Sequence, residues 1–335
     1  MYYCLQWPDF YSLYISRCST WRTEFRTDRD RGLDRRSAHP ISKCVALPIP
    51  DNCFEIGQMT GLDDRGYLAP EGFLTELQIE LGMSAIESHG RLVLARAPAR
   101  PVAWAANTWF EPLKIPISSI TDAAKKLRSI QRNWVLYSHA HHRRAALIAE
   151  NLPKVSAKPL AFGAPSPKAP LGSWTLIAPD LMLASPRCSS PFPNGEVQFI
   201  EDRSTPPSRA YLKLWELFTL LGERPHDGEF CIDLGASPGG WTWVLQKLGA
   251  RVLSIDKAPL DARIAALPGV EFQRTSAFAL DPRSVGPVDW LFADVVCYPK
   301  RLLALVNKWF ASGLVRRFVC TIKFQGETDF ETMCE

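Results

Sequence analysis

The chain has 335 residues, of which 46% are hydrophobic and 22% are charged, and its formal net charge is +4. This composition excludes a mostly disordered chain, and no stretch approaches the ~20 apolar residues of a membrane-spanning helix. The length predicts about two domains, at roughly 100–200 residues per domain. The beginning of the chain carries Asp9, Arg17, Arg22 and Glu24 within a region without an apolar core, so we expect no secretion signal.

The nine cysteines include no Cys-x-x-Cys pair, and their number is odd. A disulfide scaffold or a structural zinc site would require closely spaced pairs. The cysteine pattern therefore predicts reduced thiols in a cytoplasmic protein.

Residues 1–58 show no sustained helical or strand period, and a run of alternating charges extends from Arg22 to Arg36. Such runs are typical of solvated chain without a packed core. We therefore expect 1–58 to be disordered or a spurious extension, with Met59 as the start of the first domain.

Residues 59–207 predict a smaller α+β domain with a proline-rich extension. Apolar spacing indicates a helix over 70–81, which Gly82 ends. A short strand follows at 91–95, and two further helices are expected over 120–131 and 142–152. In the extension, 173–177 is strand-like, and Asn194-Gly195 suits a hairpin turn.

The predicted helices of this domain are unusually basic. Between Ala123 and Ala149 there is no acidic residue, while Trp134 and Tyr137 are interleaved with six cations, namely Lys125, Lys126, Arg128, Arg132, Arg143 and Arg144. Such a patch can neutralise phosphates while aromatic rings stack on unpaired bases, which favours RNA binding. The alternative is a solvated helix face with the aromatic residues in the core. The nearby His139, His141 and His142 have no acidic or cysteine partner in sequence, so we expect no metal site.

Residues 208–335 predict a doubly wound α/β domain. Ser208 can N-cap a helix that Gly222 ends. Short apolar strands alternate with helices after it, which is typical of a mostly parallel sheet covered on both faces. The expected strands are 230–234, 252–255, 270–272, 290–293 and 318–322.

A strand, a glycine turn and a helix form the strongest motif, Asp233-Leu-Gly-Ala-Ser-Pro-Gly-Gly-Trp241. Gly235, Gly239 and Gly240 permit a sharp turn and a close approach of the backbone to a ligand. The helix that begins near Gly240 can direct N–H groups at a carboxylate or phosphate. The spacing is neither that of a dinucleotide fingerprint nor that of a P-loop.

Two acidic residues complete this predicted site. Asp233 can accept a hydrogen bond from an amine, and Asp256 ends the next strand, where an acid can bind both ribose hydroxyls. A nucleoside with an amino-acid tail, S-adenosylmethionine, has these groups. The alternative is a packed βα turn that binds no ligand.

This motif resembles the cofactor loop of FtsJ-type ribose 2′-O-methyltransferases, above all those bacterial members that methylate a cytidine of 23S ribosomal RNA. The resemblance covers about 65–335 and is strongest over 208–325. It implies a Rossmann-like methyltransferase domain preceded by a THUMP-like RNA-binding domain. It also implies that Ser237, Pro238 and Trp241 belong to the cofactor loop, and that Lys213, Asp294 and Lys323 match the catalytic Lys, Asp and Lys of the family.

The implied residues suit the chemistry. A ribose hydroxyl is a poor nucleophile, and its proton must leave as the methyl group arrives. A lysine near a second cation can act as base or stabilise the developing alkoxide. We therefore expect Lys323 to act as base, Lys213 to hold the hydroxyl, and Asp294 to orient one or both lysines.

Two departures from the family pattern matter. Ser276 stands where the family often has an acid that contacts adenine. The family's final Glu has no match, and we expect the domain to be incomplete at its C-terminus and to lack the last two strands of the sheet. This leaves two alternatives open: a catalytically inactive RNA-binding protein, or a methyltransferase that acts on a small molecule or a protein. The oligomeric state is left open as well.

Overall fold

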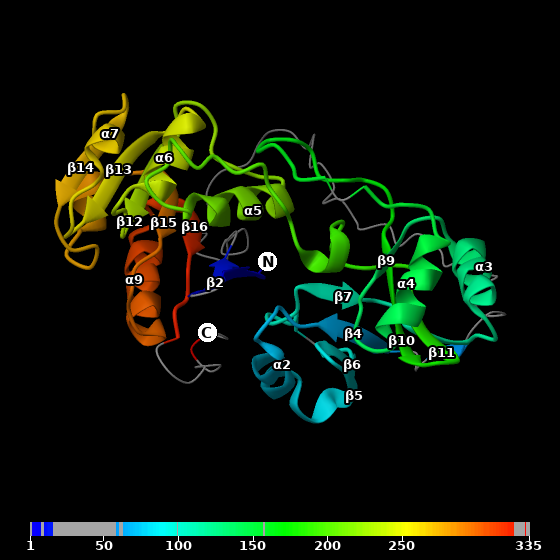
Figure 1. The fold of residues 1–335 in the computed structure, drawn as a ribbon. Coiled ribbons are helices and arrows are strands. Elements are labelled where there is room, and N and C mark those ends of the chain that lie inside the picture. Colours follow the sequence, from blue (N-terminus) through cyan, green and yellow to red (C-terminus); the bar gives the residue numbers. More distant parts are fainter. Residues whose placement is uncertain are drawn as a thin grey trace, which may run out of the picture.

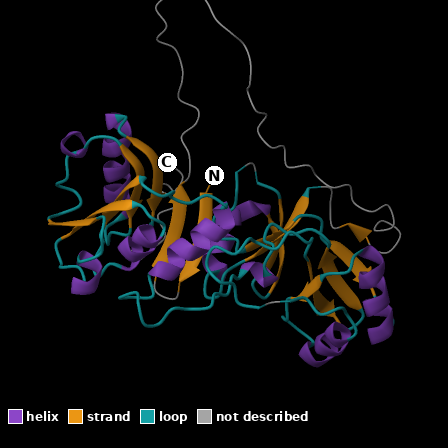
Figure 2. Ribbon diagram, turned by 90° about the horizontal axis from the view of Figure 1, so that it is seen from above, coloured by secondary structure: helices purple, strands orange, loops and turns teal. Residues whose placement is uncertain are grey.

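The structure is a computed structural model that describes residues 2–7, 10–15, 58–59, 63–98, 100–156, 158–324 and 332. Two parts follow each other along the chain, an N-terminal region that ends near residue 207 and a C-terminal domain that begins at residue 208. Figure 1 shows these parts side by side, with helix α5 (Tyr211–Leu221) extending between them. Figure 2 shows the same two parts from above, with the C-terminal domain on the left and the N-terminal region on the right.

The C-terminal domain contains a sheet of five parallel strands in the order β14-β13-β12-β15-β16. Their bounds are Phe230–Leu234 for β12, Arg251–Asp256 for β13, Val270–Arg274 for β14, Val288–Ala293 for β15 and Val315–Cys320 for β16. Chain order reverses between β12 and β15, which is the position where open α/β sheets bind ligands. This topology confirms the predicted mostly parallel sheet.

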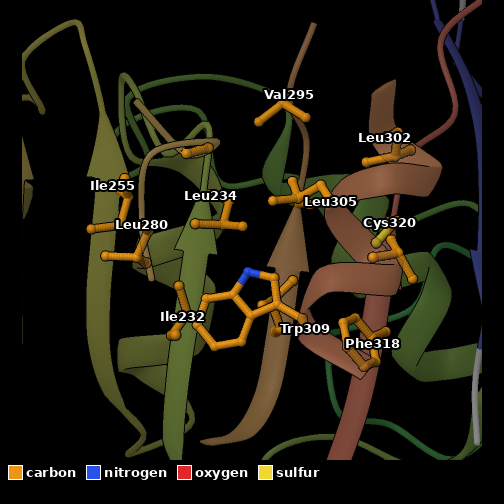
Figure 3. Packing of buried hydrophobic residues seen from close by; sticks show 14 of the residues in the cluster. Ile232, Leu234, Ile255, Leu280, Val295, Leu302, Leu305, Trp309, Phe318 and Cys320 are labelled. Atoms are coloured by element: carbon orange, nitrogen blue, oxygen red, sulfur yellow. The ribbon is translucent and has the colours of Figure 1, made fainter. Parts of the chain in front are cut away.

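Helices cover both faces of this sheet, as the apolar strands predict. On one face, Leu302, Leu305 and Trp309 of α9 (Pro299–Ser312) pack against strand side chains such as Ile232 and Phe318 (Figure 3). On the other face, α5 and α6 (Gly240–Lys247) form an aromatic core around Trp215 and Trp243. Two one-turn helices, α7 (Ala262–Ala265) and α8 (Pro282–Val285), lie in connections between strands.

The N-terminal region is α+β, as predicted. It contains two separate sheets, a division that the sequence patterns do not reveal. The first sheet is antiparallel in the order β5-β6-β4-β7, with helix α2 (Leu74–Leu81) and the one-turn η1 (Gly82–Ser84) in one of its connections. Its strands are Asp64–Leu68 for β4, Ala85–His89 for β5, Leu92–Arg96 for β6 and Asn107–Trp109 for β7.

The second sheet has the order β3-β8-β11-β10-β9 and is covered by α3 (Ile120–Ile130) and α4 (His142–Glu150). Its strands are Gln58–Met59 for β3, Leu113–Pro116 for β8, Trp134–Leu136 for β9, Gly172–Ala178 for β10 and Leu181–Ser185 for β11. A shared cluster that includes Trp109, Tyr137 and Leu183 joins the two sheets.

A hairpin lies near the start of the chain. Strands β1 (Tyr2–Trp7) and β2 (Phe10–Ile15) pair antiparallel, and β2 lies beside β16 of the C-terminal sheet (Figure 1). Most of 1–58 lies outside the described residues, so the expectation of disorder for that segment stays a prediction. The same holds for the expected absence of strands after β16, because residues 325–331 and 333–335 are also outside the described part.

Two local predictions are wrong. Helix α5 begins at Tyr211 with Ala210 at its N-cap, so the Ser208 side chain does not cap it. Asn194-Gly195 forms a short 3-10 turn (η2, Pro193–Gly195) and not a hairpin. The chain after this turn pairs instead with Leu160, whose N–H donates to the Gln198 carbonyl and whose carbonyl accepts from the Ile200 N–H.

Within the described ranges, no helix is both long and apolar enough to cross a membrane.

Candidate active site

Three residues far apart in sequence meet at the carboxyl edge of the parallel sheet. The Lys213 ammonium of α5 lies 3.1 Å from Oδ2 of Asp294, and the Lys323 ammonium lies 2.9 Å from Oδ1 of the same carboxylate. The two lysine side chains are only 6% and 7% exposed. Asp294 thus bridges both cations, which confirms the contact predicted among these residues, while their catalytic roles stay predictions.

The sheet itself brings these groups together. Asp294 is the first residue after β15, and its N–H donates to the Leu234 carbonyl at the end of β12. Lys323 follows β16, and Nζ also donates to the Asp294 carbonyl at 2.9 Å. The neighbouring Thr321 hydroxyl donates to Oδ1 of Asp294. Because parallel strands end at the same edge, residues just beyond them converge in space.

The charges at this point do not cancel. Two buried ammonium groups share one carboxylate, so the formal balance of Lys213, Asp294 and Lys323 is positive. Buried charges are costly unless they are paired and hydrogen-bonded, and this cluster is both. An excess positive charge in a partly dry site suits a reaction in which negative charge develops on an oxygen.

The glycine turn passes directly against this cluster. Gly235 has a φ of +80°, and a Cβ built there would lie 3.0 Å from the Val295 side chain and 3.1 Å from the Asp294 carbonyl oxygen. Gly239 has a φ of +117°, and a Cβ there would lie 2.8 Å from Ile264. Both positions therefore require glycine for conformation and for space. The turn stands between β12 and α6, as the motif predicts.

Asp233 has an oxygen that is available for a ligand. Oδ2 accepts a hydrogen bond from the Thr242 hydroxyl at 2.7 Å, while Oδ1 is buried and has no hydrogen-bond partner within the described part of the chain. Burial raises the pKa of Asp233 to about 7. A buried carboxylate oxygen without a partner is costly, and an amine donor would compensate for it. This geometry fits the amino group of S-adenosylmethionine.

Asp256 ends β13 and holds the turn in place. Its two oxygens accept hydrogen bonds from the N–H groups of Ser237 at 3.0 Å and Ala258 at 2.9 Å. Each carboxylate oxygen has a second lone pair, so the acid can still accept from ribose hydroxyls. The Ser237-Pro238 peptide bond is cis, and the Ser237 hydroxyl donates to the Pro259 carbonyl. Ser276 is half-buried just beyond β14.

Two residues have other surroundings than the sequence predicts. Trp241 is buried between α6 and α5, and its indole N–H donates to the Ala210 carbonyl at 3.0 Å, which is a packing role. The Ser208 hydroxyl lies 2.7 Å from the position of a Cβ on Gly240, the first residue of α6. That oxygen is buried, and no described group pairs with it. Sequence reasoning missed Ser208 as a site residue, because only the tertiary fold brings it to this helix N-terminus.

The basic segment is on the surface, but its aromatic residues are not. Lys125, Arg132 and Arg143 are exposed on or beside α3 and α4. Trp134 and Tyr137 are buried core residues, so the prediction that they interleave with the cations to stack on bases is wrong. The Trp134 indole N–H donates within the domain, to the carbonyls of Leu127 and Gln131. Trp134 lies between α3 and α4 in the sequence, and its side chain fills part of the core that these two helices cover.

The other three cations are partly engaged within the fold. Lys126 pairs with Asp122 at 3.1 Å, Arg128 donates to the Asn151 carbonyl at 2.6 Å, and Arg144 is half-buried on α4.

A cavity of about 1030 Å³ lies between the N-terminal region and α5, and it is not lined by Lys213, Asp294 or Lys323.

Comparison with known proteins gives the same class as the geometry. Residues 206–314 match the family model of FtsJ-like methyltransferases. The chain is 43% identical over 130 residues to a ribosomal RNA large subunit methyltransferase M of Halorhodospira halophila, an alignment that covers 38% of each protein. It is 31% identical over 212 residues to the protein of that name from Xanthomonas oryzae pv. oryzae, covering 61% of this chain and 56% of the relative.

These relatives confirm the predicted resemblance. Three alignments with proteins of this name, among them that of Halorhodospira halophila, cover 33–38% of each relative, so the chain spans well under two thirds of their length. FtsJ-like methyltransferases use S-adenosylmethionine, which agrees with the predicted cofactor. A solved ribosomal RNA methyltransferase structure from Plasmodium falciparum overlaps with a TM-score of 0.30 at 18% identity, covering 38% of this chain and 82% of that chain.

Proposed function

We propose that this chain transfers a methyl group from S-adenosylmethionine to a ribose 2′-hydroxyl of ribosomal RNA. The single observation that carries the proposal is the Asp294 carboxylate held between the ammonium groups of Lys213 and Lys323, against the glycine turn. Methyl transfer to a hydroxyl needs a proton acceptor and positive charge near the oxygen, and this cluster supplies both. A cytidine of 23S RNA is the target that the resemblance implies.

The cofactor contacts follow from the chain's own groups. Asp233 Oδ1 would accept from the amino group, and the N-terminus of α6 with the Ser208 hydroxyl would bind the carboxylate. Asp256 would accept from the ribose hydroxyls, and the backbone near Ser276 would lie beside the base. When bound, S-adenosylmethionine supplies an electrophilic methyl group on a positively charged sulfur.

The protein would contribute to the reaction in two ways: it would position the ribose hydroxyl and accept its proton. Lys213 would donate a hydrogen bond to the ribose oxygen and hold it in line with the methyl group. Lys323 in its unprotonated form would take the hydroxyl proton as the ribose oxygen bonds to the methyl carbon and the bond from that carbon to sulfur breaks. Asp294 contacts both lysines and would keep the two side chains apart and oriented.

The N-terminal region would hold the RNA. Six cations from Lys125 to Arg144 lie on or near α3 and α4, and exposed cations there can contact phosphates without reading sequence. Base stacking by Trp134 and Tyr137 is not part of the proposal, because both are buried. A THUMP-like character for this region stays a prediction, as does a cytoplasmic location, which a ribosomal RNA substrate implies.

The experiment uses radiolabelled S-adenosylmethionine and unmodified 23S RNA with the wild-type chain and Lys323→Ala. We expect the variant to lose on the order of 10²- to 10⁴-fold in rate, the range of general base catalysis. Lys247→Ala is the matched control, because Lys247 is exposed in the last turn of α6, away from the glycine turn. Nuclease digestion and mass spectrometry should locate the label on a 2′-O-methylcytidine.

Three results would contradict the proposal. Equal incorporation by Lys323→Ala and the wild type would exclude Lys323 as the base. RNA binding without incorporation by the wild-type chain would instead favour an inactive RNA-binding protein. Incorporation into protein or a small molecule, but not into RNA, would identify another substrate class.

A further inference from the structure

The predicted base, Lys323, lies outside the regular sheet. Strand β16 ends at Cys320, so the direction of the Lys323 side chain depends on how its neighbours in sequence are held. On the preceding side, the Thr321 N–H donates to the Ala293 carbonyl and Ile322 is buried in the core of the C-terminal domain. On the following side, the neighbour is Phe324.

Phe324 is held by both parts of the molecule. It packs against the core of the C-terminal domain and against the core of the first N-terminal sheet. Its ring centroid lies 6.1 Å from that of Trp104 in the N-terminal region. The neighbouring Ala103 also packs against the core of the C-terminal domain. The residue that follows Lys323 in the chain is therefore held by a contact with the N-terminal region.

Trp104 is itself firmly held. It is a buried residue of the loop between β6 and β7, and its ring stacks on Phe73 at 5.6 Å. The Glu80 carboxylate of α2 accepts from the N–H groups of both Ala103 and Trp104 at 2.9 Å.

Glu80 has the properties of a structural anchor. Its side chain is 2% exposed and lies 3.3 Å from Arg100, which belongs to the same loop as Trp104. A buried carboxylate is costly unless its oxygens are satisfied, and the two N–H groups and the guanidinium satisfy this one. Glu80 thus fixes the loop at three points, and the loop presents Trp104 to Phe324.

We propose that Glu80 and Trp104 are positioning residues that act through Phe324 to hold Nζ of Lys323 in the position that the reaction requires. The proposal rests on the proposed function, because it assigns these residues to the base of that reaction. It gives the N-terminal region a second task besides holding RNA. Misplacement of a catalytic group by about 1 Å can cost on the order of 10²-fold in rate, so a packing contact at this distance can control catalysis.

The test compares Trp104→Ala, Trp104→Phe and Glu80→Gln with the control Trp174→Ala. Trp174 is an equally buried tryptophan of the N-terminal region, but it lies in the core of the second sheet. We expect Trp104→Ala to lower kcat at least about tenfold with little change in KM for RNA, since misplacement affects the chemical step. Trp104→Phe, which keeps a ring against Phe324, should recover most of this loss, and Glu80→Gln should give an intermediate loss.

A second measurement does not depend on activity. Trace labelling of the folded chain with acetic anhydride, followed by mass spectrometry, reports the reactivity of Lys323 relative to Lys308 of α9 in the same digest. The ratio should rise in Trp104→Ala and stay at the wild-type value in Trp174→Ala. Equal ratios and equal kcat in these two variants would overturn the proposal. If the wild type does not methylate RNA, the proposed function fails separately, and the labelling ratio alone decides whether Trp104 positions Lys323.

Discussion

The two halves of this protein place their candidate functional groups in opposite ways. In the C-terminal domain, Lys213, Asp294 and Lys323 come from distant segments of the chain and meet at one largely buried point. In the N-terminal region, the cations of α3 and α4 lie within one stretch of sequence and spread over the surface. A single substitution in the converging site should therefore have a large effect on function. Single substitutions in the spread patch should have small effects that add together.

Among effects on ligand affinity, the largest is expected at the glycine turn, where Gly235→Ala adds one methyl group. The residue would have to keep a φ of +80° and would contact the Asp294 carbonyl and Val295. We expect cofactor affinity to fall at least about tenfold, alongside a stability loss of about 1–2 kcal/mol from the left-handed conformation. Calorimetric titration with S-adenosylmethionine measures the affinity.

The chain contains a matched control for this change. Gly286 has a similar φ of +85°, but a Cβ there would meet nothing within 4 Å. Gly286→Ala therefore carries the conformational cost without the contact, and it should leave cofactor affinity unchanged. If both variants lose affinity equally, the turn is not in contact with a cofactor site, and the contrast between the two halves is weakened.

A smaller effect is expected from the ionisation of Asp233. Burial raises its pKa to about 7, whereas the unfolded chain has the ordinary value of about 3.9. Between these values the folded state binds the proton that the unfolded state has released, so this group makes stability fall as pH rises from about 4 to about 7. The slope is at most about 1.4 kcal/mol per pH unit.

Asp233→Asn removes this dependence. Urea unfolding of the wild type and the variant across pH 5 to 8 should show the variant gaining relative stability as pH rises, while it binds S-adenosylmethionine more weakly. A constant difference in the free energy of unfolding across this range would show that Asp233 does not titrate there.

The smallest effect is expected in the N-terminal region. Arg143→Glu changes one exposed cation of α4. We expect a loss of a few-fold in RNA affinity and a decrease of about 1 in the slope of log affinity against log salt, as for one lost phosphate contact. Fluorescence anisotropy with an RNA fragment at several salt concentrations measures both.

Lys247→Glu in the C-terminal domain is the control, and it should change the salt slope less. Equal effects of the two substitutions would mean that RNA contacts are not concentrated on α3 and α4. A 100-fold loss of RNA affinity from Arg143→Glu alone would show that the contacts on this surface converge on one point. The contrast drawn between the two halves would then be wrong.

Sequence patterns predicted the parts of this protein that depend on neighbours in the chain. The strand, glycine turn and helix around Gly235 are local, because each needs only its own spacing and the freedom of glycine. The meeting of Lys213, Asp294 and Lys323 was also predictable, since parallel strands end at one edge and a family resemblance identified the three positions.

Contacts between segments could not be predicted in this way. Only the tertiary structure decided that Trp134 and Tyr137 are buried, that Asp233 keeps one oxygen without a described partner, and that Ser208 lies at the start of α6. It also decided that Trp104 packs on Phe324 beside the predicted base. Burial depends on which surfaces face each other after folding, and a pattern of residue types along one chain does not specify that pairing.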